Sequence, residues 1–254
     1  MGWFSNSKQS ESSNDLIMNA LHKSLAIIEF EPNGRIITAN VNFLRVMGYS
    51  LAEIQGQHHS LFLSPSETQS DEYRQFWQRL NAGEFISDEF KRIGKNGKEV
   101  WIQATYNPVI DSQGQVLKVV KFATDITEQK LKAVEAAGQI TAISKSQAVI
   151  EFNLDGSIIG ANDNFLKTFG YQANEIQGQH HRLFVTSEYA NSQEYQAFWD
   201  KLGRGEYDSG EYLRIGKQGE EIWIYASYNP IYDMNGKPFK VIKYATDITA
   251  HKEL

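Results

Sequence analysis

Apolar and polar positions follow one order twice along this chain. Each copy opens with two β-rich runs around a turn, as in IIEFEPNGRIITAN, whose Asn-Gly pair is typical of a hairpin. A helical stretch follows, NFLRVMGYSLAEIQGQ, in which Gly48-Tyr49 predicts the end of one helix and Ser50 the cap of another. The segment DEYRQFWQRL (residues 71–80) spaces its aromatic side chains and its leucine three or four apart, which predicts an amphipathic helix.

The last third of each copy predicts three strands. EFKRIGKNGKEVWIQATYNPVID contains two β-rich runs around Lys95-Asn96-Gly97, again a hairpin turn, and VLKVVKFATDIT supplies the third run. Two strands, several short helices and three strands predict an α+β fold. We expect one five-stranded antiparallel sheet in each copy, with the helices on one face.

The positions of two groups of side chains on these strands predict whether they are buried or exposed. Alternation along the strand predicts a place in the core of the sheet for Trp101 and Tyr106, and for Trp223 and Tyr228 in the second copy. The basic residues beside the hairpin turn indicate solvated charges at a sheet edge; they lie in the ranges Arg92 to Lys95 and Arg214 to Lys217.

The two copies are related by a constant offset of 122 residues, so that Asn40, His58, Trp77, Trp101 and Asp125 recur as Asn162, His180, Trp199, Trp223 and Asp247. An offset this long indicates a duplicated domain and not a short repeat unit. We expect a flexible N-terminal segment at residues 1–18, domains at 19–127 and 144–250, a helical linker at 128–143, and the start of an exit helix at 251–254.

The linker TEQKLKAVEAAGQITAISKSQ is rich in good helix formers. Asp125, three residues before Glu128, resembles a capping box and predicts a helix start directly after the last strand. Apolar residues in this helix predict a narrow stripe, made of Leu131, Val134, Ile140 and Ile143. Such a stripe packs either on the chain's own domains or on a second copy of the chain.

Composition excludes several classes of function. The hydrophobic fraction of 41% and the net charge of −6, with both signs interspersed, indicate packed domains without the basic surface that nucleic acid needs. The absence of cysteine excludes disulfides, thiol catalysis and cysteinyl flavin photochemistry. No apolar run approaches the roughly 18 residues of a membrane span, and no secretory signal begins the chain, so we expect a cytoplasmic protein. No catalytic motif stands out, which argues against an enzyme.

Adjacent histidines occur in both copies, His58-His59 and His180-His181. If the helix beginning near Ser50 continues, neighbouring side chains point about 100° apart, so at most one of each pair faces the interior. Alternatively, one histidine is a solvated helix end and the other caps carbonyl groups at that end. No acidic or cysteine residue completes a metal-binding set, and we expect no metal site apart from haem iron.

Several motifs together resemble the PAS domain: AN-NF after the first hairpin, GY before an E-I-GQ helix, the RIGK-G segment followed by W-I, and a closing Asp-Ile-Thr after an aromatic residue. The segments GQHH-LF, FW--L--GE and W-I-A-YNP further resemble the tandem PAS sensors of soluble bacterial chemoreceptors of the aerotaxis type. The resemblance implies a sensor that holds a small ligand between sheet and helices.

The same resemblance implies a cofactor, FAD or alternatively haem b, although a pocket filled by side chains remains open. Asn40, Trp77, Asn162 and Trp199 align with flavin-contacting residues, and one histidine of each pair lies where haem-binding members supply an axial ligand. The other interpretation is that each tryptophan is core and each asparagine caps a helix. Ser60-Leu61 replaces the arginine and acidic residue that flavin-binding members place after the histidine, and Arg182 is displaced, which disfavours FAD.

Asp125, Thr127, Asp247 and Thr249 are expected to couple the ligand to the flanking helices. The sequence thus predicts a non-catalytic sensor of oxygen or redox state. It would form a homodimer and act on chemotaxis proteins or a downstream signalling domain. The alternatives are a cofactor-free dimerisation module, or the input of a histidine kinase or cyclic-dinucleotide enzyme.

Overall fold

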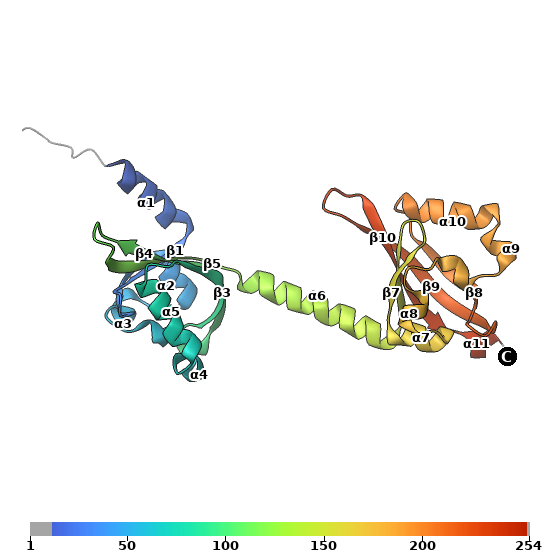
Figure 1. The fold of residues 1–254 in the computed structure, drawn as a ribbon, viewed down its shortest axis with the longest axis horizontal. Coiled ribbons are helices and arrows are strands. Elements are labelled where there is room, and N and C mark those ends of the chain that lie inside the picture. The colour runs from blue at the N-terminus through green and yellow to red at the C-terminus, as the bar shows by residue number, and fades with distance from the viewer. Residues whose placement is uncertain (1–11, 253–254) are drawn as a thin grey trace, which may run out of the picture. The chain divides into compact units, whose positions relative to one another are not determined.

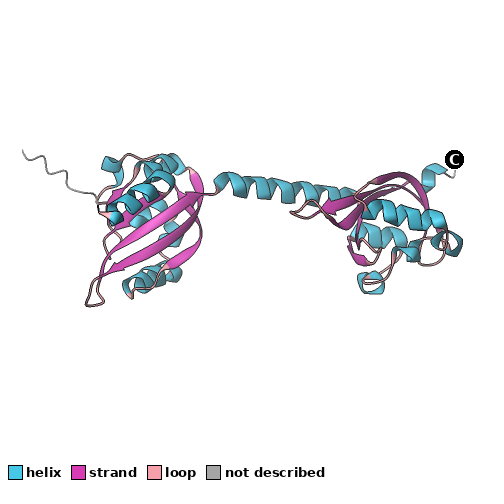
Figure 2. Cartoon of the chain, turned by 90° about the horizontal axis from the view of Figure 1, so that it is seen from above, coloured by secondary structure: helices cyan, strands magenta, loops and turns pink. Residues whose placement is uncertain are grey.

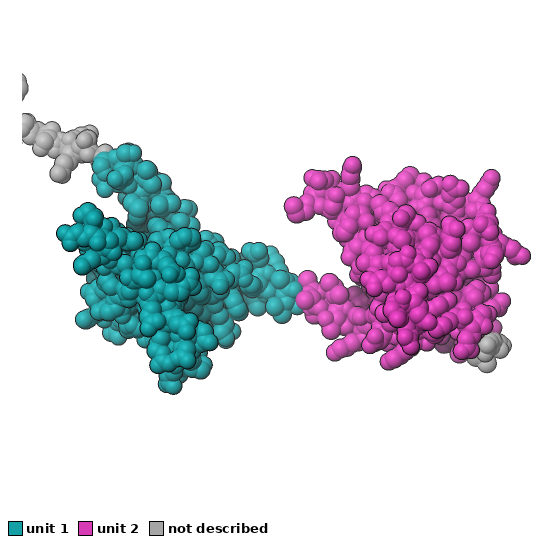
Figure 3. All heavy atoms as spheres, in the orientation of Figure 1, with its two compact units in different colours: residues 1–134 teal, residues 135–254 magenta. Residues whose placement is uncertain are grey.

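Residues 12–252 are described in the computed structural model, which divides into two compact units, residues 1–134 and 135–254 (Figure 3). The elements of the first unit are α1 (Ser13–Ser24), β1 (Ala26–Phe30), β2 (Ile36–Ala39), α2 (Val41–Met47), α3 (Leu51–Ile54), the 3-10 helix η1 (His59–Phe62), α4 (Pro65–Thr68), α5 (Asp71–Asn81), β3 (Ile86–Ile93), the 3-10 turn η2 (Lys95–Gly97), β4 (Glu99–Ile110) and β5 (Val116–Asp125).

Helix α6 (Thr127–Ser146) contains the boundary between the two units. The elements of the second unit repeat the order of the first: β6 (Ala148–Asn153), β7 (Ile158–Ala161), α7 (Asp163–Phe169), α8 (Ala173–Ile176), η3 (His181–Phe184), α9 (Ser187–Ala190), α10 (Gln193–Gly203), β8 (Asp208–Ile215), β9 (Glu221–Tyr232), β10 (Pro238–Asp247) and α11 (Thr249–Lys252).

Each unit is one five-stranded antiparallel sheet, in the order β2-β1-β5-β4-β3 and β7-β6-β10-β9-β8. The short helices between the second and third strands of each unit pack on one face of its sheet (Figures 1 and 2). The α+β fold predicted from the sequence is therefore confirmed. Strands β3 and β8 lie at the edge of their sheets, opposite the first hairpin.

Strand β4 shows how alternation builds the core. Val100, Ile102, Ala104 and Tyr106 are buried against the helices, whereas Trp101 lies on the other face and is only partly buried. The core prediction is confirmed for Tyr106 and Tyr228 and wrong for both tryptophans, because Trp101 and Tyr106 differ by an odd number of residues and so point to opposite faces.

The ends of the elements correct several expected boundaries. Helix α1 begins at Ser13, so residues 13–18 are not a flexible segment, while residues 1–11 lie outside the described part. Helix α6 begins at Thr127, and the Asp125 carboxylate accepts a hydrogen bond from the Thr127 amide, so no capping box forms with Glu128. Helix α11 begins at Thr249, two residues before the expected start of the exit helix.

The apolar residues of α6 do not form the predicted stripe. Leu131, Val134 and Ile140 are exposed by 65%, 70% and 65%. Leu131 and Ile140 are separated by about two and a half helical turns, which places them on opposite sides of the helix. The stripe prediction is therefore wrong. No helix within residues 12–252 combines the length and apolar character needed to cross a membrane.

Candidate functional site

A cavity lies at the same place in both units, between the edge strand and the helices that face it. In the first unit its volume is about 430 Å³. Its lining comes from α4, α5 and β3 and the residues beside them: Leu63, Ser66, Glu67, Ser70, Glu72, Tyr73, Phe76, Phe90 and Arg92. Binding sites for small molecules in proteins commonly have volumes of about 300–1,000 Å³.

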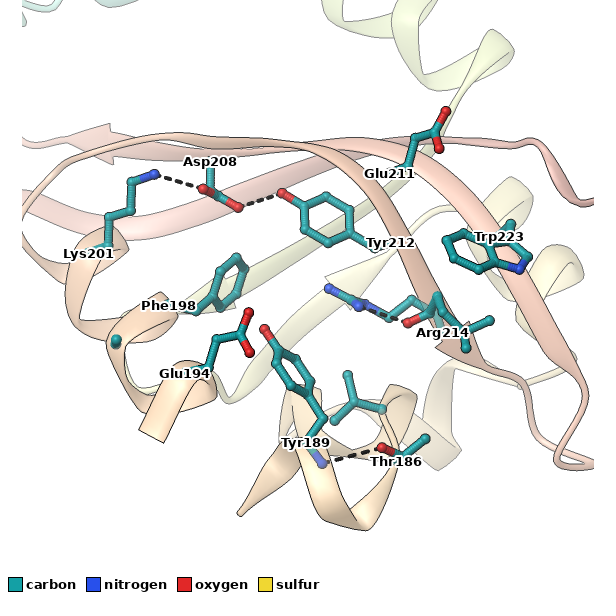
Figure 4. A pocket seen from close by; sticks show the side chains of 13 residues that line it. Thr186, Tyr189, Glu194, Phe198, Lys201, Asp208, Glu211, Tyr212, Arg214 and Trp223 are labelled. Carbon is teal, nitrogen blue, oxygen red and sulfur yellow. Dashed lines mark hydrogen bonds and ion pairs between the residues drawn. The ribbon is translucent and has the colours of Figure 1, made fainter. Parts of the chain in front are cut away.

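The corresponding cavity of the second unit has a volume of about 630 Å³ and extends past the edge of β8 to Glu211 and Trp223 on the outer face (Figure 4). Tyr212 and Asp208 replace Phe90 and Ile86 of the first unit, so this wall is more polar. The Asp208 carboxylate accepts hydrogen bonds from Lys201 (2.7 Å) and from the Tyr212 hydroxyl (2.5 Å).

A buried arginine lines each cavity. Arg92 is 6% and Arg214 is 3% exposed, so the prediction of solvated edge charges is wrong for both. Each lies on the inner face of its strand, two residues after an aromatic side chain, and its guanidinium carbon is about 4.6–4.7 Å from the centroid of that ring, Phe90 or Tyr212. The period of two along the strand could have revealed this position.

The second histidine of each pair lies behind the arginine, fully buried between two tyrosines. The His59 ring is 2.9 Å from the Tyr73 hydroxyl through Nδ1 and 3.0 Å from the Tyr106 hydroxyl through Nε2. Arg92 donates to the same Tyr106 hydroxyl at 3.2 Å. His181 repeats these contacts with Tyr195 (2.9 Å) and Tyr228 (3.1 Å), so the network is a duplicated feature of the fold.

Burial and neighbouring cations determine the protonation of this network. The pKa of His59 lies well below its usual value because of burial and of the positive charges of Arg92 and Lys121. The imidazole is therefore neutral, and one ring nitrogen donates while the other accepts. Burial raises the pKa of Tyr73 to about 12. For Tyr106 burial acts in the same direction, but Lys121 and Arg92 outweigh it and lower the pKa.

The first histidine of each pair lies outside these two cavities and has a structural role, although His180 and Trp199 together line a separate cavity of about 270 Å³. His58 Nδ1 accepts from the Ser60 amide at 3.1 Å and caps η1, while Nε2 donates to the Asn33 carbonyl at 3.0 Å. His180 makes the equivalent bonds to Arg182 and Asp155. The helix starting after Ser50 ends at Ile54, so the assumption that it continues to the histidines is wrong. The inference that at most one histidine of each pair faces the interior is confirmed.

Trp77 and Trp199 are not among the residues that line these cavities. Trp77 is partly buried on α5, with its ring centroid 5.8 Å from that of Phe30 and 5.5 Å from that of His59. The indole nitrogens of both tryptophans are buried and make no hydrogen bond within the described residues. The neighbouring aromatic residue on each helix, Phe76 or Phe198, lines the cavity instead.

Asn40 and Asn162 cap helices, as the alternative interpretation predicted. The Asn40 Oδ1 accepts from the Phe43 and Ile27 amides, each at 2.9 Å, and its Nδ2 donates to the Leu25 carbonyl at 2.8 Å. Asn162 Oδ1 likewise accepts from Phe165 and Val149 at 2.9 Å. Each amide thus joins its domain to the end of the preceding helix, α1 or α6.

The residues expected to couple the ligand to the helices hold the last strand to the helix that follows. The Thr127 hydroxyl donates to the Asp125 carboxylate at 2.6 Å and accepts from the Trp101 amide at 2.9 Å. In the second unit Thr249 bonds Asp247 at 2.6 Å and the Trp223 amide at 3.0 Å. The start of each exit helix is therefore fixed to the strand beside the edge strand.

The histidines do not fit haem ligation, because all four rings already use both nitrogens in hydrogen bonds. Within residues 12–252, no group of three His, Asp or Glu side chains could hold a metal ion. Nor do the residues expected for FAD gather at the cavities, because Asn40 and Asn162 bond to backbone and both tryptophans lie apart from the lining.

Comparison with known proteins places this geometry in a family. The model of the PAS fold matches residues 36–123 and 158–245. The biofilm dispersion protein BdlA of Pseudomonas aeruginosa is 45% identical over 91% of this chain and 56% of its own length. The oxygen sensor protein DosP of Escherichia coli is 28% identical over 48% of this chain and 15% of its own length.

The aerotaxis receptor of Escherichia coli is 32% identical over 39% of this chain and 19% of its own length. The chain thus spans little more than half of the first of these relatives and less than a fifth of the other two. The two matches to the family model together cover more than half of the chain and run from β2 into β5 and from β7 into β10, with the helices between them. The chain belongs to the PAS fold family and carries two copies of the fold in tandem, as a sensory module.

Proposed function

We propose that this chain is the cytoplasmic input region of a longer chemoreceptor-type signalling protein, and that a small ligand in either cavity changes the helix that follows that domain. Two relatives carry the names of an oxygen sensor and an aerotaxis receptor, which supports a sensory role of this kind. The downstream partner would be a signalling domain or a chemotaxis protein.

One observation carries the proposal: the cavity and the exit helix are joined through neighbouring residues of the sheet. Arg92, which lines the cavity, is paired across the strands with Val100. The next residue, Trp101, donates its amide to Thr127 at the start of α6. The second unit repeats this route from Arg214 through Ile222 and Trp223 to α11. A ligand that shifts the edge strand therefore acts directly on the helix start.

The test follows the route at Thr127. A library of small metabolites is screened by thermal stabilisation of the chain, and a compound that binds is then used in hydrogen–deuterium exchange. We expect bound compound to change exchange in α6 or α11, and Thr127→Val to abolish the change in α6 without loss of binding. Thr141→Val, in the middle of the same helix, is the matched control. An unchanged response of α6 in Thr127→Val refutes the proposal.

Haem b and FAD do not form part of the proposal, because the histidines and asparagines expected to hold them have other hydrogen-bond partners and both tryptophans lie apart from the lining of the two cavities. An absorption spectrum of the purified protein tests this directly. We expect neither a Soret band nor flavin bands. If either appears and Trp77→Ala or Trp199→Ala removes it, a redox sensor that reads oxygen through those tryptophans is supported instead.

A homodimer is the remaining partner proposal, and it rests on the exposed apolar side chains of α6 alone. Light scattering on the purified chain measures the mass directly. A mass of twice 28.9 kDa that falls to the monomer in Leu131→Glu supports a dimer formed through α6. A monomer over the whole concentration range excludes a homodimer for these residues. A dimer whose cavities bind none of the compounds supports the alternative of an interaction module.

A further inference from the structure

The arginine in each cavity is a buried cation without a carboxylate partner, and this suggests the chemistry of the ligand. We propose that each cavity binds a small organic monocarboxylate with an apolar or aromatic body, and that its carboxylate contacts Arg92 in the first unit and Arg214 in the second. This inference rests on the proposed sensory function and specifies its ligand class.

The hydrogen bonds of Arg92 leave much of its guanidinium free. Nη1 donates to the Lys91 carbonyl at 2.9 Å and Nη2 to the Tyr106 hydroxyl at 3.2 Å, while the buried Nε has no partner in the described residues. A guanidinium carries five N–H groups, so within residues 12–252 three of those of Arg92 have no acceptor, and two of those of Arg214, whose others bond to Leu213 and Tyr228. A carboxylate matches the fork of an arginine by accepting two hydrogen bonds at once.

No acidic side chain within residues 12–252 lies within 4.0 Å of the nitrogens of Arg92 or Arg214 in an ion pair. Glu67 lines the first cavity, but its carboxylate is bonded to the amide and hydroxyl of Ser64. In the second cavity Asp208 is bonded to Lys201 and Tyr212. A buried charge without a counter-ion is strongly unfavourable, so an anion bound beside either arginine would offset part of that cost.

A buried lysine lies behind the cavity in each unit. The Lys121 ammonium lies 4.8 Å from the centroid of the Tyr106 ring, and Lys243 lies 5.1 Å from that of Tyr228. Burial and the positive charge of Arg214 lower the pKa of Lys243 well below its usual value. The interior of each domain thus places an arginine and a lysine around one tyrosine, and no acidic side chain within residues 12–252 forms an ion pair with either of them.

The remaining lining favours a monocarboxylate over a phosphate. Glu67 and Glu72 line the first cavity, and Glu194 lines the second and points into it in Figure 4. These acids repel a second negative charge on the ligand. The other walls are aromatic, formed by Phe76 with Phe90 and by Phe198 with Tyr212, and they suit an apolar or planar body.

The experiment compares acids with their neutral amides on the full chain by isothermal titration. The probes are benzoate and indole-3-acetate, with benzamide, indole-3-acetamide and inorganic phosphate as comparisons. We expect at least one acid to bind at least tenfold more tightly than its amide, and phosphate to bind more weakly than that acid. Equal affinity for acid and amide, tighter binding of phosphate, or no binding of either acid overturns the inference.

Variants then assign the site. Arg92→Met and Arg214→Met should each remove the acid's binding to one domain, and the double variant should weaken it at least tenfold. Arg45→Met and Arg204→Met, which remove exposed arginines outside the cavities, should change nothing. Circular dichroism checks that each variant is folded. If a Met variant is unfolded, Arg92→Lys or Arg214→Lys replaces it. We expect weakened acid binding in the Lys variants as well, because an ammonium cannot form the paired hydrogen bonds of a guanidinium with a carboxylate. Unchanged acid binding in a folded double variant overturns the assignment.

The same measurements separate this inference from the proposed function. If the acids do not bind but another compound changes exchange in α6, the ligand class is wrong and the sensory proposal stands. If an acid binds through the arginines but leaves the exchange of α6 and α11 unchanged, the ligand class stands and the proposed signalling route fails.

Discussion

Asn162 is the point at which the second domain holds the helix that precedes it. Its Oδ1 accepts from the amides of Val149 in β6 and Phe165 in α7, each at 2.9 Å. Its Nδ2 donates to the carbonyls of Ser144 and Gln147 at the end of α6, also at 2.9 Å. One side chain therefore joins a strand and two helices. Replacing it separates the capping role from the attachment of α6.

Two substitutions make that separation. Asn162→Ala removes the two acceptor bonds and the two donor bonds to backbone carbonyls: the cap contributes about 1 kcal/mol and each of the other three bonds roughly 0.5–1.5 kcal/mol, so we expect a loss of about 4 kcal/mol in the free energy of unfolding. Asn162→Asp keeps a good cap with both acceptor bonds but loses the two donor bonds and places a negative charge against two carbonyl groups. We expect it to cost about 2 kcal/mol, with the loss concentrated at the end of α6.

Hydrogen–deuterium exchange over a urea series measures both effects by position. In Asn162→Asp, peptides covering residues 140–147 should exchange faster in the absence of urea, while the sheet of the second unit keeps most of its protection. Asn235→Asp, in an exposed turn of the same unit, is the control. The reasoning is refuted if Asn162→Asp leaves exchange at the end of α6 as it is in the unmodified chain.

Three further changes test other parts of the structure. The pKa of His59 is depressed in the folded chain, so only the unfolded chain binds a proton at this residue as the pH falls below about 6.5. The first unit should therefore lose up to about 1.4 kcal/mol of stability per pH unit. In His59→Gln, the free energy of unfolding measured in urea should differ less between pH 7 and pH 5 than in the unmodified chain. Lys243→Met removes a buried amine without a hydrogen-bond partner in the described residues, and it should raise the free energy of unfolding by about 1–3 kcal/mol. A lower free energy of unfolding in urea denaturation would contradict this account. Gly34→Ala should lower the thermal unfolding temperature more than Gly114→Ala does. Both glycines have positive φ, but only a methyl group added at position 34 would meet the His58 ring, at 2.6 Å. Equal losses in the two variants would show that this contact does not matter.

Local rules were sufficient to predict the architecture from the sequence. Asn-Gly turns, a glycine after the first helix and the spacing of aromatic residues each act over a few residues, so the order of strands and helices could be read directly. Gly48, for instance, ends α2 with φ of 78°, a conformation that glycine adopts without strain. The duplication then confirmed each assignment by repeating it.

The chemistry of the site depended on facts that local rules do not contain. Whether His58 or His59 is buried depends on where a short helix ends and a 3-10 turn begins, which is a matter of packing. Arginine is rarely buried, which favours a solvated charge for Arg92, although its position in the alternation of the strand places it on the inner face. The role of Asn40 in fastening α1 required knowledge of which carbonyl groups lie within its reach.

The polar wall of the second cavity has a consequence for how a signal would be graded. Both cavities offer the same guanidinium, but Tyr212 with Asp208 would face the proposed ligand in one and Phe90 would face it in the other. Two sites that share an anchor and differ in a wall bind one compound with different affinities. A chain with such a pair responds first through one domain and later through the other as concentration rises. Its response then extends over a wider range of concentrations than a single domain could report.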